Sequence, residues 1–517
     1  MRLNILIGGK AGQGINKISE IISKIITELG YFTFNYRDYQ SLIRGGHNFN
    51  VISISDYKIG SVETKLDCIV ALDEKTKKIH KKELKNNGFV IDSKNFESFG
   101  KNLNLALSGA LLKILGIEKN YLLEKIKKEF QTKEALDAAE KGFDSQTKKF
   151  EFKKLNRKIY LMDGSEAIAQ GAINSNIDLY LAYPMTPSTP LMAELAKRQE
   201  EKNLLVFEPE GEISVINTAL GASFAGAKVM IGTSGGGFDL MVEAISFQGM
   251  TEIPLVLYLA SRAGPSTGMP TYTSQADLND ALRAGHGEFP RVVIAPGDPL
   301  ECIEKTNEAF YLSEKFGVLS IILSDKHLAE SGFSFDKEPK KPLKIEIKRK
   351  VPGKGIIRTS SYEHDEFANT TEDAEMAKRN AECRLKKYEK IKKECQKFQM
   401  IKKYGNENAE NLIISWGSNK TVILDALDEI DESVRNPKKG KWKFLHVLYL
   451  KPLSDEIKKE ILKSKRVILI ENNSTGQLGR LIREKTGISI KDRILKYDGR
   501  PFYLDELKNK ILNLLNK

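Results

Sequence analysis

The sequence has few of the residues that build metal clusters and disulfide frameworks. Its 517 residues include only 4 cysteines and 6 histidines. Cys68, Cys302, Cys383 and Cys395 are scattered and form no CxxC pair, and the histidines show no HxxxH spacing. Such spacings are the usual signs of zinc and iron–sulfur sites. We therefore expect no metal or cluster on this chain, and we expect the thiols to be reduced, as in a cytoplasm.

Long apolar runs and an export signal are missing as well. No apolar stretch approaches the roughly 18 residues that a membrane-spanning helix needs. The opening residues, MRLNILIGGK, enter an expected strand directly and lack the layout of a signal peptide. We therefore expect a cytoplasmic protein that has no membrane partner.

Basic residues are in excess, but they are not concentrated. Lysine and arginine number 81 against 69 acidic residues, which gives a net charge of +12. The lysines alternate with glutamate along expected helices, as in LLEKIKKEFQTKEALDAAEK. Mixed charge of this kind is typical of solvated helix faces and not of a nucleic-acid surface. We expect no nucleic-acid partner.

The middle of the chain carries apolar runs that end in polar or glycine-rich patches. LYLAY leads into YPMTPST at 183–189, KVMIGTS leads into TSGGGF at 233–238, and IPLVLYLAS leads into SRAGPSTGMPT at 261–271. GHGEFPRVV at 285–293 closes the set. In an α/β sheet, ligands bind in the crevice outside the carboxyl ends of the strands. We therefore expect all these patches at the ends of strands, and we expect the first three loops to form one shared active-site rim.

Single residues in these patches suit particular ligands. The hydroxyls of YPMTPST stand at an expected helix start, which suits an anion or a carbonyl group. Glu212, in EPEGE, could complement a helix dipole at the surface, or it could hold or move a proton beside a ligand nitrogen. Arg262 could form a structural ion pair or clamp a planar carboxylate. Taken singly, these residues leave both alternatives open.

The start of the chain predicts a strand, a glycine turn and a helix, in ILIGGKAGQGINKISEIISKII. Gly9, Gly12 and Gly14 have the spacing GxxGxG, whereas a dinucleotide-binding loop has GxGxxG. Two interpretations stay open for this turn. It could bind a nucleotide, or it could let the helix pack closely against the strand.

In their order along the chain, these motifs resemble the alpha subunit of 2-oxoacid:ferredoxin oxidoreductases of the 2-oxoglutarate synthase type. The resemblance rests on YPMTPST, EPEGE, TSGGGF, RAGPSTGMPT and GHGEFPRVVIAPGDP, and it extends from about residue 159 to the C-terminus. ILIGGKAGQGI at 5–15 and LIRGGHNFNVISISD at 42–56 resemble the gamma subunit of the same enzymes. The chain therefore resembles a gamma–alpha fusion.

The resemblance implies an α/β fold with three parallel-sheet domains. The first is a gamma-subunit-like domain at 1–149, and the second is a thiamine-diphosphate pyrimidine-binding domain at 150–335. A linker and helical segment follows at 336–405, and a transketolase C-terminal-like domain occupies 406–517.

The resemblance also implies an enzyme. Members of this family convert a 2-oxoacid and coenzyme A to an acyl-CoA and CO2 with thiamine diphosphate, and they pass electrons to ferredoxin. The fusion favours 2-oxoglutarate as the substrate, with pyruvate and branched-chain 2-oxoacids as alternatives. A non-oxidative thiamine decarboxylase and a non-catalytic assembly or regulatory paralogue are the other functions to consider.

The site residues are carried over from the matching motifs. Glu212 would bind the aminopyrimidine N1′ and favour its imino tautomer, and Glu210 is its rival. Thr186 would lie near cofactor and substrate, whereas Arg262 and Thr267 would hold the substrate carboxylate. The expected cofactor-binding set also includes Pro184, Ser234 and Gly235.

Half of the expected cofactor site has no counterpart in the sequence. The Mg²⁺ site on the phosphates of thiamine diphosphate is normally signalled by GDG followed by Asn, and this chain has only GDP at 297–299. The resemblance therefore implies a beta subunit that supplies the phosphate and Mg²⁺ site and an iron–sulfur cluster, in an (alpha-beta)2 heterotetramer. The chain also departs from the family's TSGPGF, because Gly236 replaces the usual proline and Asp239 follows the motif.

Overall fold

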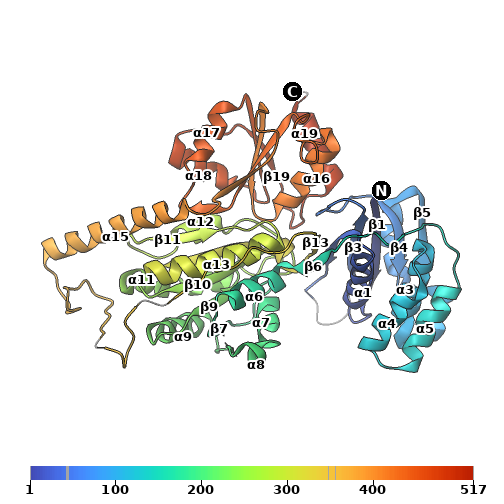
Figure 1. The fold of residues 1–517 in the computed structure, drawn as a ribbon, viewed down its shortest axis with the longest axis horizontal. Coiled ribbons are helices and arrows are strands. Elements are labelled where there is room, and N and C mark those ends of the chain that lie inside the picture. The colour runs from blue at the N-terminus through green and yellow to red at the C-terminus, as the bar shows by residue number, and fades with distance from the viewer. Residues whose placement is uncertain (1, 42–45, 347–348, 356, 516–517) are drawn as a thin grey trace. The chain divides into compact units, whose positions relative to one another are not determined.

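The structure is a computed structural model in which three sheets are flanked by helices (Figure 1). It describes residues 2–41, 46–346, 349–355 and 357–515. The predicted α/β class with three sheets is confirmed. The chain divides into two compact units. Unit 1 comprises Met1–Met162, Ser331–Glu338 and Tyr503–Asn509, and unit 2 comprises Asp163–Glu330, Pro339–Phe502 and Lys510–Lys517.

Unit 1 is built on a sheet of mixed strand direction. In order across the sheet, its strands are β5 (Leu84–Asp92), β4 (Leu66–Ala71), β1 (Arg2–Gly9), β3 (Asn48–Ser55), β2 (Phe32–Asp38), β13 (Gly332–Phe335) and β6 (Tyr160–Asp163). β4 pairs in parallel with β1 and β5, whereas β3 pairs antiparallel with β1 and β2. β13 returns to this sheet from late in the chain and pairs antiparallel with β2.

The glycine turn of unit 1 leads from β1 into α1 (Ile15–Glu28), whose isoleucines recur at helical spacing and are buried. Gly14 has a φ of 76°, and a side chain there would collide with Asn104. This contact favours the packing interpretation of the turn. Positions 42–45 of the second gamma-like motif lie outside the described residues. The other helices of unit 1 are α2 (Glu74–His80), α3 (Leu103–Leu115), α4 (Lys119–Glu129) and α5 (Lys133–Asp144).

The first sheet of unit 2 is parallel except at one edge. Its strands in order are β17 (Tyr449–Lys451), β11 (Arg291–Ile294), β12 (Leu319–Asp325), β10 (Leu255–Ser261), β9 (Val229–Thr233), β7 (Leu179–Leu181) and β8 (Leu205–Phe207). Only β17 pairs antiparallel with its neighbour. β9, β10 and β12 are buried throughout, as their apolar runs predict for strands covered on both faces.

Helices follow the strands of this sheet in the alternation that parallel pairing requires. The parallel strands end together at one side, which we call the carboxyl edge. Their helices are α6 (Gly164–Asn174), α7 (Thr189–Ala196), α8 (Gln199–Lys202), α9 (Glu212–Phe224), α10 (Gly235–Leu240), α11 (Val242–Thr251), α12 (Leu278–Arg283), α13 (Pro299–Phe316) and α14 (Lys326–Glu330).

One of the patches predicted at the strand ends lies at the opposite, amino edge. GHGEFP at 285–290 comes directly before β11, and Arg291 at the start of β11 lies opposite Leu319 at the start of β12. β10 and β12 run the same way, so Ser261 at the end of β10 lies opposite Asp325. The prediction that this patch follows a strand was wrong. Its apolar run, RVVI, comes after the glycine-rich residues, whereas in the other motifs the apolar run comes before them.

The second sheet of unit 2 is formed by the last part of the chain. Its strands in order are β14 (Ile401–Gly405), β16 (Trp442–Val447), β15 (Asn411–Trp416), β18 (Arg466–Glu471) and β19 (Asp492–Leu495). We call it the C-terminal sheet. Its core is continuous with that of the first sheet, since Leu257 and Ile321 belong to the same apolar cluster as Trp416 and Leu445. The helices here are α15 (Ala374–Cys395), α16 (Asn419–Asp431), α17 (Glu456–Lys463) and α18 (Gln477–Thr486). The last helix, α19 (Leu504–Leu515), is divided between the two units after Asn509.

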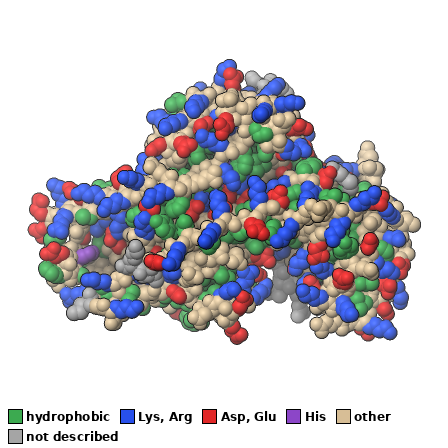
Figure 2. Space-filling view, viewed as in Figure 1, with side chains coloured by type: hydrophobic (Ala, Val, Ile, Leu, Met, Phe, Trp, Pro, Cys, Tyr) green, Lys and Arg blue, Asp and Glu red, His purple; other side chains and the backbone are tan. Residues whose placement is uncertain are grey.

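Charged side chains of both signs are interspersed over the face of the molecule shown in Figure 2. This is the pattern that the alternation of lysine and glutamate in the sequence predicts. Within the ranges that the structure describes, no helix is both long and apolar enough to cross a membrane.

Candidate functional site

Buried polar atoms without partners gather at the carboxyl edge of the first sheet of unit 2. An unpaired polar atom that is buried costs about 1–3 kcal/mol, so each one calls for an explanation. Some lie in the core, but those at this edge belong to the loops and helix starts that follow β8, β9 and β10. A ligand that pairs with them would remove the cost. The atoms are Glu212 Oε1, Ser234 Oγ, Ser261 Oγ, Arg262 Nε and Asp277 Oδ2.

Glu212 is the first residue of α9, and its side chain is 5% exposed. Its carboxylate therefore lies at the positive end of the helix dipole, where a negative charge is favoured. Glu210, two residues earlier, is exposed and accepts a hydrogen bond from Ser214, which lowers the pKa of Glu210. Of the two carboxylates, only Glu212 has a buried oxygen without a partner.

The glycines of TSGGGF allow two carboxyl groups to approach the end of β9. A methyl group on Gly237 would lie 2.5 Å from Glu212 Oε1, and one on Gly235 would lie 3.0 Å from Asp277 Oδ2. Any side chain at these two positions would displace a carboxyl group. Gly236, which departs from the family's proline, faces open space and is under no such constraint.

Arg262 joins two of the predicted loops. Its Nη1 donates a hydrogen bond of 2.9 Å to the backbone carbonyl of Thr186. Burial lowers the pKa of Arg262, and the nearby Asp277 partly offsets this, but a guanidinium stays charged in a protein. The structure thus brings Arg262 and Thr186 together, as the sequence predicts for a shared rim. Pro184 and Thr267 are exposed at the rim.

The loop that follows Arg262 is held by its own backbone. Met269 N donates to Ala263 O at 2.8 Å, and Ala263 N donates to Tyr272 O at 3.2 Å. Gly268 has a φ of 51°, and a side chain there would collide with the Ala263 carbonyl. Glycine is therefore required for this turn, which fixes the direction in which Arg262 leaves β10.

Asp277 is a site residue that the sequence analysis missed. It precedes α12, in SQADL, and looks like an ordinary N-cap, yet its side chain makes no cap hydrogen bond. Burial raises the pKa of the Asp277 carboxyl to about 6, and the neighbouring Asp280 and Asp239 add to the shift. The charge of the nearby Arg262 opposes it. No local pattern distinguishes such a residue, because its environment is built by β9 and β10.

We expect Asp277→Asn to raise the thermal midpoint at neutral pH. Above about pH 6 the wild-type protein must bury an ionised carboxylate, whereas below the ordinary carboxyl pKa of about 4 it does not. The advantage of the variant should therefore be absent near pH 4, grow as the pH rises to 6, and then stay constant at up to roughly 2 kcal/mol. Thermal unfolding between pH 4 and 8 measures it. An advantage that does not change with pH would contradict a buried ionising group.

The chemistry of these residues is compatible with a nitrogen heterocycle such as the pyrimidine of thiamine diphosphate, which the sequence predicts. The buried, unpaired Glu212 Oε1 suits a ring nitrogen. Ser234, which follows β9, adds a second buried group without a partner. A diphosphate and its metal need several oxygen donors instead. Among the described residues, no group of three or more His, Cys, Asp or Glu side chains is arranged to hold a metal.

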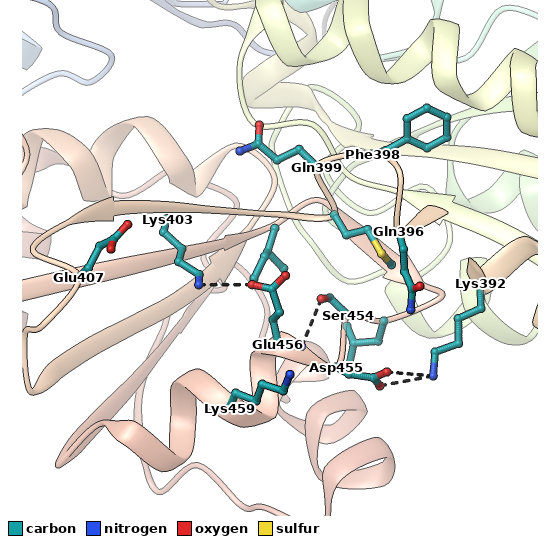
Figure 3. A pocket seen from close by; sticks show the side chains of 13 residues that line it. Lys392, Gln396, Phe398, Gln399, Lys403, Glu407, Ser454, Asp455, Glu456 and Lys459 are labelled. Atoms are coloured by element: carbon teal, nitrogen blue, oxygen red, sulfur yellow. Dashed lines mark hydrogen bonds and ion pairs between the residues drawn. The ribbon is translucent and has the colours of Figure 1, made fainter. Parts of the chain in front are cut away.

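Two ion pairs line a surface cavity elsewhere in unit 2, in contrast to the unpaired groups at the carboxyl edge. This cavity of about 680 Å³ lies among the end of α15, the start of β14 and the start of α17 (Figure 3). Lys392 Nζ lies 3.2 Å from Asp455, and Lys403 Nζ lies 3.3 Å from Glu456. We therefore place the candidate site at the carboxyl edge and not here.

Two protein-family models match the chain. Residues 170–399 match the model described as "Pyruvate flavodoxin/ferredoxin oxidoreductase, thiamine diP-bdg". Residues 4–101 match the model described as "Pyruvate ferredoxin/flavodoxin oxidoreductase". The two matches cover the glycine turn of unit 1 and the whole carboxyl edge of unit 2.

Relatives and a solved structure extend the similarity over the full length. The chain is 28% identical to the 2-oxoacid:ferredoxin oxidoreductase subunit alpha of Saccharolobus solfataricus, over 100% of this chain and 98% of that protein. It is 27% identical to the 2-oxoglutarate synthase subunit KorA of Methanothermobacter marburgensis, over 69% of this chain and 99% of that one. Its fold matches a 2-oxoglutarate:ferredoxin oxidoreductase from Magnetococcus marinus with a TM-score of 0.90 at 24% identity, over 99% of both chains.

Proposed function

Because the chain belongs to the 2-oxoacid:ferredoxin oxidoreductase alpha subunits, in the form that carries a gamma-type region at its N-terminus, we propose that it catalyses oxidative decarboxylation of 2-oxoglutarate together with a beta subunit. Coenzyme A accepts the acyl group, CO2 is released, and the electrons go to ferredoxin. Residues 1–149, 150–335 and 406–517 are the gamma-like, pyrimidine-binding and C-terminal domains of this proposal, and 336–405 connect the last two.

One observation carries the proposal: Glu212 and Arg262 have buried polar atoms without partners at the same edge of one sheet. A 2-oxoacid offers a planar carboxylate beside a carbonyl group, and a guanidinium binds both oxygens of a carboxylate. A buried glutamate near a helix start can hold or transfer a proton. A surface ion pair or an ordinary helix cap would leave neither atom unpaired.

The residues divide the work as follows. Thiamine diphosphate, when bound, supplies the electron sink for decarboxylation. Glu212 would hold a proton at the pyrimidine ring, and Ser234, Gly235 and Pro184 would help to hold the cofactor. Arg262 and Thr267 bind the substrate carboxylate, and the carbonyl of Thr186 holds Arg262 in place through its 2.9 Å hydrogen bond.

Exposed apolar side chains on the elements around this edge support a partner that covers it. β8 is the edge strand of its sheet, and both Leu205 (57% exposed) and Phe207 (49% exposed) lie on it. Ile213 and Leu240 are 59% and 54% exposed on α9 and α10. Large apolar side chains that are exposed close to a site often belong to protein interfaces. The beta subunit of the proposal would bury it and supply the Mg²⁺–diphosphate site and an iron–sulfur cluster, in a cytoplasmic (alpha-beta)2 assembly.

Reconstitution tests the divided site. We expect the purified chain alone to show no coenzyme A-dependent reduction of a viologen dye by 2-oxoglutarate, and its complex with a beta subunit to be active. Pyruvate and a branched-chain 2-oxoacid, assayed in parallel, distinguish the alternative specificities. Activity of the isolated chain would disprove the divided site. An inactive complex that is fully loaded with thiamine diphosphate and clusters would instead indicate a non-catalytic paralogue.

A further inference from the structure

The segment at 269–279 connects the Arg262 loop to α12, and we call it the connecting segment. The loops and helix starts beside the strands of the C-terminal sheet, and not the sheet that carries the site, supply most of the polar contacts that hold it. Thr273 N donates to Gly499 O at 3.1 Å, and the Arg500 guanidinium lies 3.7 Å from the centre of the Tyr272 ring. The proposed mechanism assigns no task to these contacts.

Gln275 is the centre of this attachment, and its side chain is completely buried. Its Nε2 donates to Trp416 O at 2.9 Å. Its Oε1 accepts from Asn419 Nδ2 at 2.8 Å and from Asn472 N at 3.0 Å. Its backbone also pairs with this sheet, since Gln275 N donates to Asn472 O at 2.8 Å and Asn473 Nδ2 donates to Gln275 O at 3.1 Å. Gln275 therefore joins the ends of β15 and β18 to the connecting segment.

Gln477 extends the attachment on the side of α12. Its Nε2 donates to Ala276 O at 2.6 Å, and its Oε1 accepts from Asn279 N at 3.1 Å. Asp277 lies between these two positions in the sequence. The backbone on both sides of the Asp277 carboxyl is therefore held by the C-terminal sheet.

The loop ENNSTGQ at 471–477, which makes these contacts, is itself rigidly supported. The Glu471 carboxylate is 0% exposed and accepts hydrogen bonds from Trp416 Nε1 at 3.1 Å and Asn473 Nδ2 at 2.8 Å. It also accepts from Leu478 N at 3.0 Å, at the start of α18. A buried carboxylate that is satisfied in this way fixes the loop before it meets Gln275.

We propose that Gln275 is a positioning residue through which the C-terminal sheet holds the Arg262 loop and Asp277 in place for the 2-oxoacid. The connecting segment is linked to the Arg262 loop by the backbone hydrogen bond from Ala263 N to Tyr272 O. The inference rests on the proposed function of Arg262 as the carboxylate ligand. If the inference is right, the C-terminal sheet contributes to substrate binding although its residues are far from Arg262 in the sequence.

Gln275→Met tests this in the complex with the beta subunit, because methionine keeps the volume and removes every side-chain hydrogen bond. Gln248→Met is the matched control. Gln248 is 1% exposed in the same unit and donates to Ile253 O at 2.7 Å, but it lies at the amino edge. Asn419→Ala, which removes one donor to Gln275, is the milder variant if Gln275→Met does not fold.

We expect amide hydrogen exchange of residues 262–279 to increase in Gln275→Met and to stay at the wild-type rate in Gln248→Met. The KM for the 2-oxoacid should rise about 10- to 100-fold, as misplacement of a positioning loop produces. The dissociation constant of thiamine diphosphate should change less than twofold, since Glu212 is not on the segment. Unchanged exchange and KM, or equal losses of 2-oxoacid and thiamine diphosphate affinity, would overturn the inference.

Arg262→Met separates this inference from the proposed function. If Arg262→Met leaves the KM for the 2-oxoacid unchanged, Arg262 does not bind the substrate carboxylate and the proposed function of this residue is wrong. If Arg262→Met raises the KM and Gln275→Met does not, Arg262 binds the carboxylate but Gln275 does not position it.

Discussion

Replacement of Glu212 by glutamine is expected to lower the kcat of the reconstituted enzyme by about 10²- to 10⁴-fold, the usual contribution of a positioned proton-transfer group. Glutamine keeps the size of the side chain and the contact with Gly237, but it cannot exchange a proton. The variant should therefore fold and assemble as the wild type does. Steady-state turnover of the complex at saturating thiamine diphosphate measures the loss.

Glu210→Gln is the matched control for this prediction. Glu210 is the same residue type two positions away, but it is exposed and paired with Ser214. Its replacement should change kcat less than twofold. Equal losses in the two variants would point to a change in the loop before α9, and an active Glu212→Gln complex would remove Glu212 from the chemistry.

The strands around the site could be predicted because their apolar runs are short, continuous and bounded by glycine and proline. β7, β9 and β10 each fall within a predicted run, and their parallel pairing brings the following loops to one edge. The loop residues Thr186 and Arg262 consequently meet, although they are 76 positions apart. Regular alternation of strand and helix makes such a meeting predictable.

Residues whose environment comes from distant segments could not be predicted. Asp277 looks like a helix cap in the sequence, and only the glycine at 235 and the end of β10 make it a buried carboxyl. Gln275 looks like an ordinary polar loop residue, yet its partners lie 141 to 198 positions away. Local pattern carries no information about such partners, because they are set by how two sheets pack.

A buried charge cluster joins the two sheets of unit 2. Lys420, on α16 and 2% exposed, forms ion pairs with Asp298 and Glu301 at the start of α13. Burial alone would lower the pKa of Lys420, but the two carboxylates outweigh it and hold this pKa well above its ordinary value. Burial likewise would raise the pKa of Glu301, and Lys420 holds it below its ordinary range. His446, 3.5 Å from Glu301, stays neutral because burial lowers its pKa to about 4.

Lys420→Met should destabilise unit 2 by about 3–5 kcal/mol at pH 8, because it removes the cation that pairs with both Asp298 and Glu301 and leaves only the weaker contact of Lys402 with Glu301, at 3.5 Å. The loss should shrink as the pH falls towards 5, since the unpaired carboxyl groups can then take up protons. Lys465→Met is the control. It breaks a 2.7 Å ion pair with Glu410 whose side chains are 76% and 59% exposed, so it should cost about 0–1 kcal/mol at either pH. Thermal or urea unfolding of both variants measures the difference. Equal losses would mean that burial adds nothing to the Lys420 pair, and a loss in Lys420→Met that does not change with pH would mean that packing, and not charge, joins the two sheets.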